Sequence, residues 1–483
     1  MVKVEVDYTK LKFKSGLEIH QQLDTSKLFC NCKSLLRKDS PDFVVKRKLH
    51  AVAGESGEVD VAAQYQKSLD KEFEYQGFDS TCLVELDEEP PHEINKEALE
   101  IAIHISLLLN CKIMPITQIM RKTVIDGSNT SGFQRTVLIA KEGYLETVNG
   151  RVGIESVFLE EDAARIVERT DKKEIYKLDR LGIPLVEIVT APDIKNAVQA
   201  KEVALQIGSV LRSCKVRRGI GTIRQDVNIS IRDENRVELK GMQNMNIFID
   251  AVDGEVLRQK KLSDSKKPTK MEVRNAQKDG TTKFMRPLPG SARMYPETDL
   301  PLLRISKGFI DKAKKSLPKL KGDIEDELKK EGLSSDMIQL LFKQDKLEAL
   351  KKLIAIYNQP NFIANVVLIY PKDLASRKNK SIEEVDEVLD EKVLRYVLEA
   401  LGRKKISEKQ VKHVLDKIID GEKPKQAIKF EKHDWNTVEE KIMNIIKGKP
   451  GLSDKAYMGL VMKEFRGKIE GQKVMEIIKK YIK

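Results

Sequence analysis

The chain has 483 residues and a net charge of +12 at pH 7, with 40% hydrophobic and 34% charged residues. This composition excludes an intrinsically disordered protein, and the length suffices for about two to four folded domains. No apolar stretch is long enough to span a membrane, and the N-terminal residues carry acids where a secretion signal is apolar. Five unevenly spaced cysteines do not suggest a disulfide framework, so we expect a cytoplasmic protein.

The first predicted element with chemical content is a strand within residues 14–25. Leu17 and Ile19 alternate with Glu18 and His20, so the carboxylate and the imidazole project from one face of this strand. Such a pair can share a divalent cation or a proton. The alternative is a polar strand that faces solvent, and the pattern taken alone favours that alternative.

Two later segments, 158–163 and 184–189, place acids in a hydrophobic setting. Glu187 has aliphatic neighbours on both sides, and Glu160 and Glu161 follow two apolar residues. A buried carboxylate needs a partner to keep its charge, so these acids are candidates for a functional site. The alternative for Glu160 and Glu161 is a solvated turn of charges.

The rest of the first 300 residues mixes strand and helix patterns. Alternating hydrophobic and polar residues predict strands at 2–8, 136–140 and 227–231. Helical spacing of apolar residues predicts helices over 95–110 and 197–214, and the polar stretch 262–270 is expected to be a loop. This pattern is typical of an α+β domain whose large mixed sheet curves around a site.

From residue 301 onward, strand signals are nearly absent and helical spacing predominates. We predict two all-helical domains, 301–403 and 404–483, with Ser407 as the cap of the helix that follows the boundary. Residues 401–483 contain 21 lysines and arginines against 12 acids, so this end carries most of the net charge. Such a module could bind a polyanion through its phosphates or could simply keep the protein soluble, and the charge alone supports both equally.

Eight segments, in this order along the chain, resemble the GatB/GatE family of tRNA-dependent amidotransferase subunits, and within it the archaeal E type. They are GLEIHQQLDTSKLFCNC (16–32), TCLVELDEEPPH (81–92), MRKTVIDGSNTSGFQRT (120–136), FLEEDAARIVE (158–168), DRLGIPLVEIVTAPDI (179–194), RRGIGTIRQDVNISI (217–231), MRPLPGSARMYPETDLP (285–301) and YMGLVMKEFRGKIEGQKV (457–474). The resemblance implies a catalytic cradle domain at 1–300, a helical domain and a tail domain that contacts tRNA. Archaeal E-type subunits also carry an inserted domain, similar to one in bacterial aspartyl-tRNA synthetases, which the short connection 241–284 cannot hold.

The resemblance implies an enzyme that converts Glu-tRNA(Gln) to Gln-tRNA(Gln). In this reaction ATP phosphorylates the glutamyl carboxylate, and ammonia then displaces the phosphate. The resemblance also implies a catalytic Mg²⁺ site formed by Glu18, His20, Glu161 and Glu187, with Glu160 as the rival of Glu161. Carboxylate oxygens suit Mg²⁺, whereas an imidazole is a less usual ligand and could instead orient water or substrate.

The resemblance further marks residues that are expected to bind substrate in the cradle. They are Ser131, Gly132, Arg135, Arg224, Asp226, Arg293 and Tyr295. Backbone amides near Gly132 could bind phosphate or the aminoacyl end of tRNA, but the segment could also be an ordinary long hairpin. The charged pair Arg224 and Asp226 is equally consistent with a structural role.

In the tail, five basic residues are expected to contact tRNA phosphates: Lys455, Lys463, Arg466, Lys468 and Lys473. The chain has no recognisable nucleophile motif for opening glutamine. The resemblance therefore implies that an asparaginase-like partner of the D type supplies ammonia, within a heterodimer or heterotetramer.

The cysteines raise the question of a structural zinc ion. Bacterial relatives have a C-x-C motif followed by a C-x-x-C motif, whereas here Cys30 and Cys32 are followed by Cys82 and Glu85. Three sulfurs and a carboxylate could bind zinc, although four-cysteine and three-cysteine-histidine sites are more typical. We favour reduced, buried thiols over an occupied zinc site.

Two alternatives to this function stay open. One is a B-type subunit that pairs with an amidase-family partner and acts on Glu-tRNA(Gln) and Asp-tRNA(Asn), which the short connection 241–284 favours. The other is a tRNA-binding subunit without catalysis. The presence of all four residues of the expected magnesium site, three glutamates and one histidine, argues against it.

Overall fold

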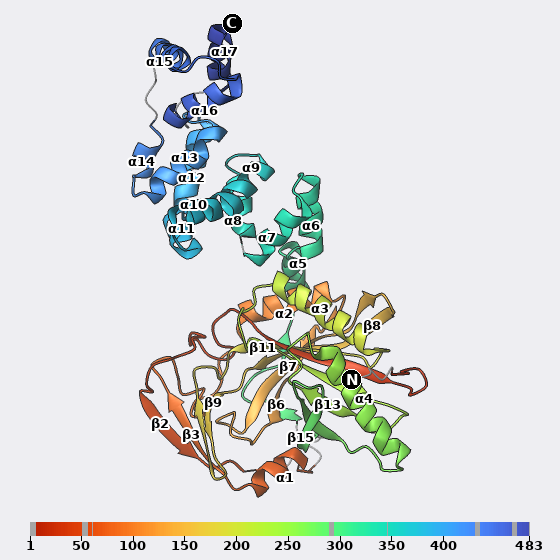
Figure 1. Ribbon diagram of the computed structural model, residues 1–483. Coiled ribbons are helices and arrows are strands. Elements are labelled where there is room, and N and C mark those ends of the chain that lie inside the picture. The colour runs from red at the N-terminus through yellow and green to blue at the C-terminus, as the bar shows by residue number, and fades with distance from the viewer. Residues whose placement is uncertain are drawn as a thin grey trace. The chain divides into compact units, whose positions relative to one another are not determined.

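The computed structural model describes residues 6–50, 57–59, 61–288, 294–344, 346–429, 435–465 and 471–482. The chain divides into two compact units, Met1–Lys321 and Gly322–Lys483. All strands among these residues belong to the first unit, and the second unit is helical (Figure 1). The predicted order, an α+β part followed by an all-helical part, is confirmed.

A large sheet forms the centre of the first unit. Its strands are β1 (Lys14–Gln22), β4 (Lys112–Ile113), β6 (Ile119–Thr123), β7 (Phe133–Thr147), β8 (Gly150–Glu161), β11 (Pro184–Thr190), β12 (Ile223–Ser230), β13 (Val237–Lys240), β14 (Glu272–Ala276), β15 (Thr282–Pro287) and β16 (Met294–Pro296). In the described part of the chain their order is β15-β14-β13-β12-β1-β11-β8-β7-β6-β16, with β4 beside β7. β13 and β14 run parallel, and β1 lies near the middle between two antiparallel neighbours.

Helices cover one face of this sheet. They are α2 (Lys96–Leu108), α3 (Ala197–Ser213) and α4 (Phe248–Asp264), and Figure 1 shows α2 and α3 lying along it. Leu17 and Ile19 of β1 are buried in the same core as the apolar residues of these helices. Because side chains alternate along a strand, Glu18 and His20 point to the opposite face.

Smaller elements complete the first unit. β2 (Phe43–Arg47), β3 (Glu72–Gly77), β10 (Lys173–Lys177) and β9 (Arg165–Arg169) form a second sheet in that order. It has its own aromatic core, which includes Phe73, Tyr75 and Tyr176. The remaining elements are α1 (Val61–Ser68), the paired β5 (Ile116–Thr117) and β17 (Leu303–Arg304), and α5 (Lys307–Lys315). Ala313 of α5 belongs to the main core, so this core extends beyond residue 301.

The second unit contains short amphipathic helices. They are α6 (Lys321–Lys330), α7 (Ser335–Lys343), α8 (Leu347–Ile354), α9 (Pro360–Ala364), a π-helical stretch (Asn365–Ile369), α10 (Tyr370–Lys378), α11 (Ile382–Val388), α12 (Glu391–Gly402), α13 (Glu408–Ile419), α14 (Pro424–Ala427), α15 (Trp435–Gly448), α16 (Asp454–Phe465) and α17 (Gly471–Ile482). One hydrophobic cluster joins α6 to α14, and another joins α15 to α17. The predicted domain boundary at 403/404 falls inside the first cluster, which contains both Leu401 and Val411. None of the described helices combines the length and the apolar character that a membrane crossing requires.

Most of the predicted elements are present. The helices expected at 95–110 and 197–214 are α2 and α3, and the strands expected at 136–140 and 227–231 lie within β7 and β12. Asn95 and Asn196 cap α2 and α3, and Ser407 is the N-cap of α13, where its backbone N–H donates to the Gln410 side chain (2.9 Å).

Two predicted elements differ from the structure. The expected strand 2–8 lies partly outside the described residues, and its described residues, 6–8, form no strand. Tyr8 instead packs edge-on against Phe13 and donates a hydrogen bond to Asp253, so a tertiary contact overrides the alternating pattern. The loop expected at 262–270 begins later, because α4 continues to Asp264.

Candidate functional site

The polar face of the sheet brings Glu18, His20 and Glu187 together. His20 on β1 lies directly opposite Glu187 on β11, and Glu18 lies two residues before His20 on the same face. The His20 Nε2 atom is 3.0 Å from Glu187 Oε2 and 3.5 Å from Glu18 Oε1. One ligand atom from each of the three residues lies within 4.8 Å of the other two, a spacing at which they could share one cation. The sequence prediction for these three residues agrees with this placement.

The protonation of the cluster reflects its crowding. Burial and the charge of Glu187 raise the pKa of Glu18 to about 7. Burial opposes the charged form of His20, but the hydrogen bond and the charge of Glu187, together with Glu18, outweigh it and raise the pKa of His20. A divalent cation here would favour the ionised carboxylates, because an opposite charge at contact distance lowers a carboxyl pKa.

Glu160 lies on the same polar face, next to this cluster. It faces Leu185 of β11 on one side and Thr136 of β7 on the other. Lys122 of β6 connects it to the cluster, because the Lys122 Nζ atom is 2.6 Å from Glu160 Oε1 and 3.5 Å from Glu187 Oε2. The sequence analysis missed Lys122. The alternation in β6 could have placed it on one face, but only the strand register shows which acids it meets.

Glu161 has a different environment from the one predicted. As the next residue of β8, it points to the opposite face of the sheet, where its Oε2 atom lies 3.3 Å from Arg135 Nη1. Arg135 also contacts Glu297 (2.9 Å), which in turn pairs with Arg121. The structure therefore does not bring Glu161 into the cluster of Glu18, His20 and Glu187. The guanidinium of Arg135, predicted to bind substrate, instead pairs with Glu161 and Glu297.

The predicted residues Arg224 and Asp226 lie beside the cluster on β12. They are the cross-strand neighbours of His20 and Glu18, respectively. The Arg224 Nη2 atom donates to Asp162 Oδ1 (2.8 Å), and Asp226 pairs with Lys240 (2.5 Å). Both charges thus have protein partners at the edge of the site, and Arg224 remains about one-third exposed.

The other predicted substrate-binding residues lie around the β6–β7 connection. Gly132 adopts a left-handed conformation (φ +75°), and the Ser131 hydroxyl donates to the Phe133 carbonyl (3.0 Å), so this turn is held by its own contacts. Tyr295 on β16 is the cross-strand neighbour of Arg121 on β6, and the Tyr295 ring centre lies 6.3 Å from that of Phe133. Arg293 lies outside the described residues.

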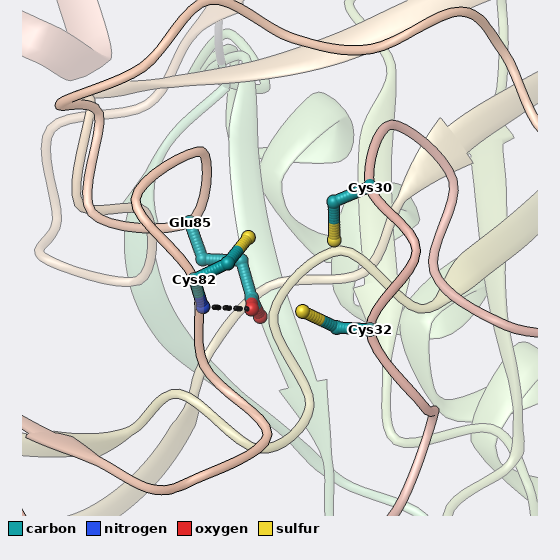
Figure 2. Close-up of side chains that lie close together, drawn as sticks. All are labelled: Cys30, Cys32, Cys82 and Glu85. Carbon is teal, nitrogen blue, oxygen red and sulfur yellow. Dashed lines mark hydrogen bonds between the residues drawn. The ribbon is translucent and has the colours of Figure 1, made fainter.

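A second cluster of possible metal ligands contains three thiols and a carboxylate. Figure 2 shows Cys30 and Cys32 on one loop and Cys82 and Glu85 on another, with the sulfur atoms directed into a shared space. One ligand atom from each of the four residues lies within 4.8 Å of the others. All three predicted cysteines therefore come together, and Glu85 completes the set.

Glu85 in this second cluster also has protein partners. Its carboxylate pairs with the fully buried ammonium of Lys27, and its Oε2 atom accepts a hydrogen bond from the Cys82 backbone N–H (3.0 Å). The hydrogen bond from Cys30 lowers the pKa of Cys82 to about 6, whereas the pKa values of Cys30 and Cys32 are raised. Thiolate character is therefore concentrated on Cys82, and a thiolate is the form that binds metal.

The predicted tRNA-binding residues of the tail are only partly described. Lys455 and Lys463 are on α16 and Lys473 is on α17, whereas Arg466 and Lys468 lie outside the described residues. The Lys473 ammonium lies 4.3 Å from the centre of the Trp435 ring, a cation–π distance.

Comparisons with known proteins fit this architecture. The chain matches two family models, the GatB/GatE catalytic domain over residues 13–311 and the GatB domain over residues 348–482. It is similar to proteins named as the E-type subunit of glutamyl-tRNA(Gln) amidotransferase, from Methanocaldococcus jannaschii (35% identical, 99% of this chain and 100% of the relative), Sulfurisphaera tokodaii (33%, 99% and 100%) and Archaeoglobus fulgidus (34%, 99% and 99%). The first of these alignments extends over 637 positions, so that relative contains segments which this 483-residue chain lacks, in agreement with the missing insert.

Proposed function

Since this chain belongs to the GatB/GatE family, we propose that it amidates Glu-tRNA(Gln) to Gln-tRNA(Gln) at the expense of ATP. The observation that carries this proposal is the cluster of Glu18, His20 and Glu187 on the polar face of the sheet. Carboxylates that converge in this way suit a Mg²⁺–nucleotide complex, because Mg²⁺ prefers oxygen ligands and keeps several of its waters.

The proposed reaction has two steps. An oxygen of the glutamyl side-chain carboxylate attacks the γ-phosphorus of ATP, and ADP leaves. The nitrogen of ammonia then attacks the acyl carbon, the carbon–oxygen bond to phosphate breaks, and the nitrogen loses a proton to give the amide. When bound, Mg²⁺ would neutralise charge on the phosphate oxygens during the first step.

The side chains of the polar face have distinct proposed roles. Glu18, His20 and Glu187 would hold the cation, and Glu160 would take the place that the sequence prediction gave to Glu161, because Glu160 shares their face. Lys122 lies between Glu160 and Glu187, where it orients both carboxylates, and it would supply a positive charge to the bound nucleotide. Arg224, partly exposed beside His20, can contact the substrate.

The partners follow from the same proposal. The ammonia would come from an asparaginase-like partner in a hetero-oligomer, and the basic tail would bind the tRNA through phosphates. Direct delivery from such a partner would protect ammonia from conversion to unreactive ammonium in water. The chain would act in the cytoplasm with its tRNA substrate.

The cysteine cluster is proposed as a structural site. Its three sulfurs fit zinc, because thiolates are strong ligands for this ion. Glu85 could become a fourth ligand only by giving up part of its pairing with Lys27, so the alternative of three reduced thiols has a structural basis as well. Zinc here would connect two loops and would take no part in the reaction.

The central experiment is an amidation assay with the isolated chain. With Glu-tRNA(Gln), ATP, Mg²⁺ and an ammonium salt, we expect Gln-tRNA(Gln) to form, and faster as the pH rises and the fraction of neutral ammonia grows. Glutamine should become a donor only after an asparaginase-like partner is added. Release of glutamate from glutamine by the purified chain alone would contradict this division of labour, and no amidation with ammonia would contradict the proposed activity.

The same assay distinguishes the proposed E-type subunit from the alternative, a B-type subunit. Amidation of Asp-tRNA(Asn) as well as Glu-tRNA(Gln), in combination with an amidase-family partner and not with an asparaginase-like one, would favour it. The family match to the GatB domain over residues 348–482 keeps this alternative relevant.

A further inference from the structure

The tail contains a pocket that has no role above, although one of its lining residues, Lys463, is among those expected to contact tRNA phosphates. It has a volume of about 390 Å³ and is lined by Ile445, Gly448, Lys449, Leu460 and Lys463, which we call the tail pocket. The first three residues come from the C-terminal end of α15 and the start of the α15–α16 connection, and the last two come from α16. This volume falls within the range of small-ligand pockets, about 300–1,000 Å³.

The rim of the tail pocket is held in place by a buried side chain. Tyr457 of α16 is only 2% exposed, and its hydroxyl donates to the Lys449 carbonyl (2.6 Å) and accepts from the Leu452 backbone N–H (3.2 Å). The connection between α15 and α16 is therefore pinned to the core of the three helices.

The pocket combines an apolar wall with unengaged positive charge. Ile445 and Leu460 pack against the core of the three helices and present their remaining apolar surface to the cavity. Within the described part of the tail, Lys473 stacks on Trp435 and Lys480 pairs with Glu439, whereas Lys449 and Lys463 pair with no acid. The two lysines at the pocket are thus available to a bound anion.

We propose that the tail pocket holds one unstacked nucleotide of the tRNA. This inference rests on the proposed function, in which the basic tail binds tRNA. The faces of a nucleobase are apolar and suit Ile445 and Leu460, while the flanking phosphates suit Lys449 and Lys463. Bases in the single-stranded loops of RNA are the ones that can be turned out for such contacts.

A glycine in the pocket permits a direct test. A Cβ atom at Gly448 would meet no atom within 4 Å, and Gly448 is not in a left-handed conformation, so Gly448→Leu adds an apolar side chain at the lining of the pocket without backbone strain. Gly459 on α16 is equally unobstructed and does not line the pocket, which makes Gly459→Leu the matched control.

The measurement is the affinity of the full chain for Glu-tRNA(Gln) over a series of salt concentrations. We expect Gly448→Leu to weaken binding by about tenfold, because the base loses its apolar contact with Ile445 and Leu460, and the salt dependence should stay unchanged because no charge is removed. Lys449→Ala and Lys463→Ala should each lower the slope of log affinity against log salt by about one. Chemical probing should show a loop base whose reactivity changes with the wild-type chain and with Gly459→Leu, but not with Gly448→Leu.

Wild-type tRNA affinity in Gly448→Leu would overturn the proposal. So would a loss of binding to the ammonia-supplying partner in this variant with tRNA binding unchanged, because the pocket would then receive a protein. Neither result bears on amidation, which is measured separately. Failure of the wild-type chain to bind any tRNA would instead contradict the proposed function itself.

Discussion

The first unit holds two clusters of side chains that could bind a metal ion, and they lie in opposite structural settings. Glu18, His20 and Glu187 lie on two paired strands, so the ladder that places His20 opposite Glu187 fixes their spacing. Cys30, Cys32 and Cys82 lie on two loops, and no such ladder relates them. Strand register can preorganise a site before its ligand arrives, whereas a loop site depends on a local crosslink, which here is the buried Lys27–Glu85 pair or a bound metal.

The largest effect is expected when one charge is removed from Glu18, His20 and Glu187, which we call the strand cluster. We expect Glu187→Gln and Glu18→Gln each to lower the ammonia-dependent amidation rate by about 100-fold or more, because preorganised charge is lost where phosphoryl transfer needs it. The melting temperature should stay close to that of the wild type, since the shape is kept. Glu155→Gln, an exposed position on β8, is the control. A wild-type rate in either variant would remove that residue from the site.

Changes at Cys30, Cys32, Cys82 and Glu85, which we call the loop cluster, should lower the stability of the fold and leave the amidation rate unchanged. Lys27→Met leaves the Glu85 carboxylate buried without its partner, so we expect the free energy of unfolding of the zinc-free chain to fall by about 3 kcal/mol. Denaturant unfolding measures this change, with the exposed Lys33→Met of the same loop as the control. If zinc restores the stability of the Lys27→Met chain, then the cluster binds zinc in the folded protein. If zinc-free Lys27→Met is as stable as the wild type, the ion pair does not hold the loops together.

Adjacent residues of β8 sharpen the comparison within the strand cluster. We expect Glu160→Gln to lower the amidation rate by about tenfold, less than the change at Glu18 or Glu187, because Lys122 already pairs with Glu160 and Glu160 would be the weaker ligand of the proposed cation. Glu161→Gln should leave the rate nearly unchanged but lower the free energy of unfolding by about 1.5 kcal/mol, because a charge-assisted hydrogen bond to Arg135 is weakened. The reverse pattern would support Glu161 as a ligand of the proposed magnesium site, as the family resemblance implied.

The smallest effect is expected for a single sulfur ligand. Cys32→Ser should lower the zinc content of the purified protein, measured by elemental analysis, and change the free energy of unfolding of the zinc-free chain by about 1 kcal/mol or less. Cys214→Ser, a thiol outside the cluster, should change neither quantity. If the wild type purified without chelator carries no zinc, the cluster consists of reduced thiols.

The alternation of residues along the sequence predicted the structure correctly where the prediction depended on a single strand. The two-residue alternation around Glu18 and His20 correctly predicted a shared face, because the pleat fixes which side chains point together. The predicted cap Ser407 marks the start of α13 for an equally local reason. The tertiary contact of Tyr8 with Asp253, however, is invisible in the run of alternating residues that precedes it.

The choice between Glu160 and Glu161 shows where such reasoning stops. Both are acids at the end of the same strand, and a shift of one residue exchanges the two faces of a sheet. Only the pairing of β8 with β11 and β7 shows that Glu160 shares the face of Glu187. Lys122 was missed for the same reason, since nothing in its own strand indicates which acids lie two and three strands away.

The central place of β1 limits how the gene can vary. Point substitutions at its outer positions change one side chain, but a one-codon insertion or deletion between Lys14 and Leu17 would shift the remainder of the strand by one residue against both β12 and β11. Leu17 and Ile19 would then enter the polar face, and Glu18 and His20 would be driven into the core beneath the helices. Homologous chains should therefore accept length changes in the surface connections while keeping this strand free of them.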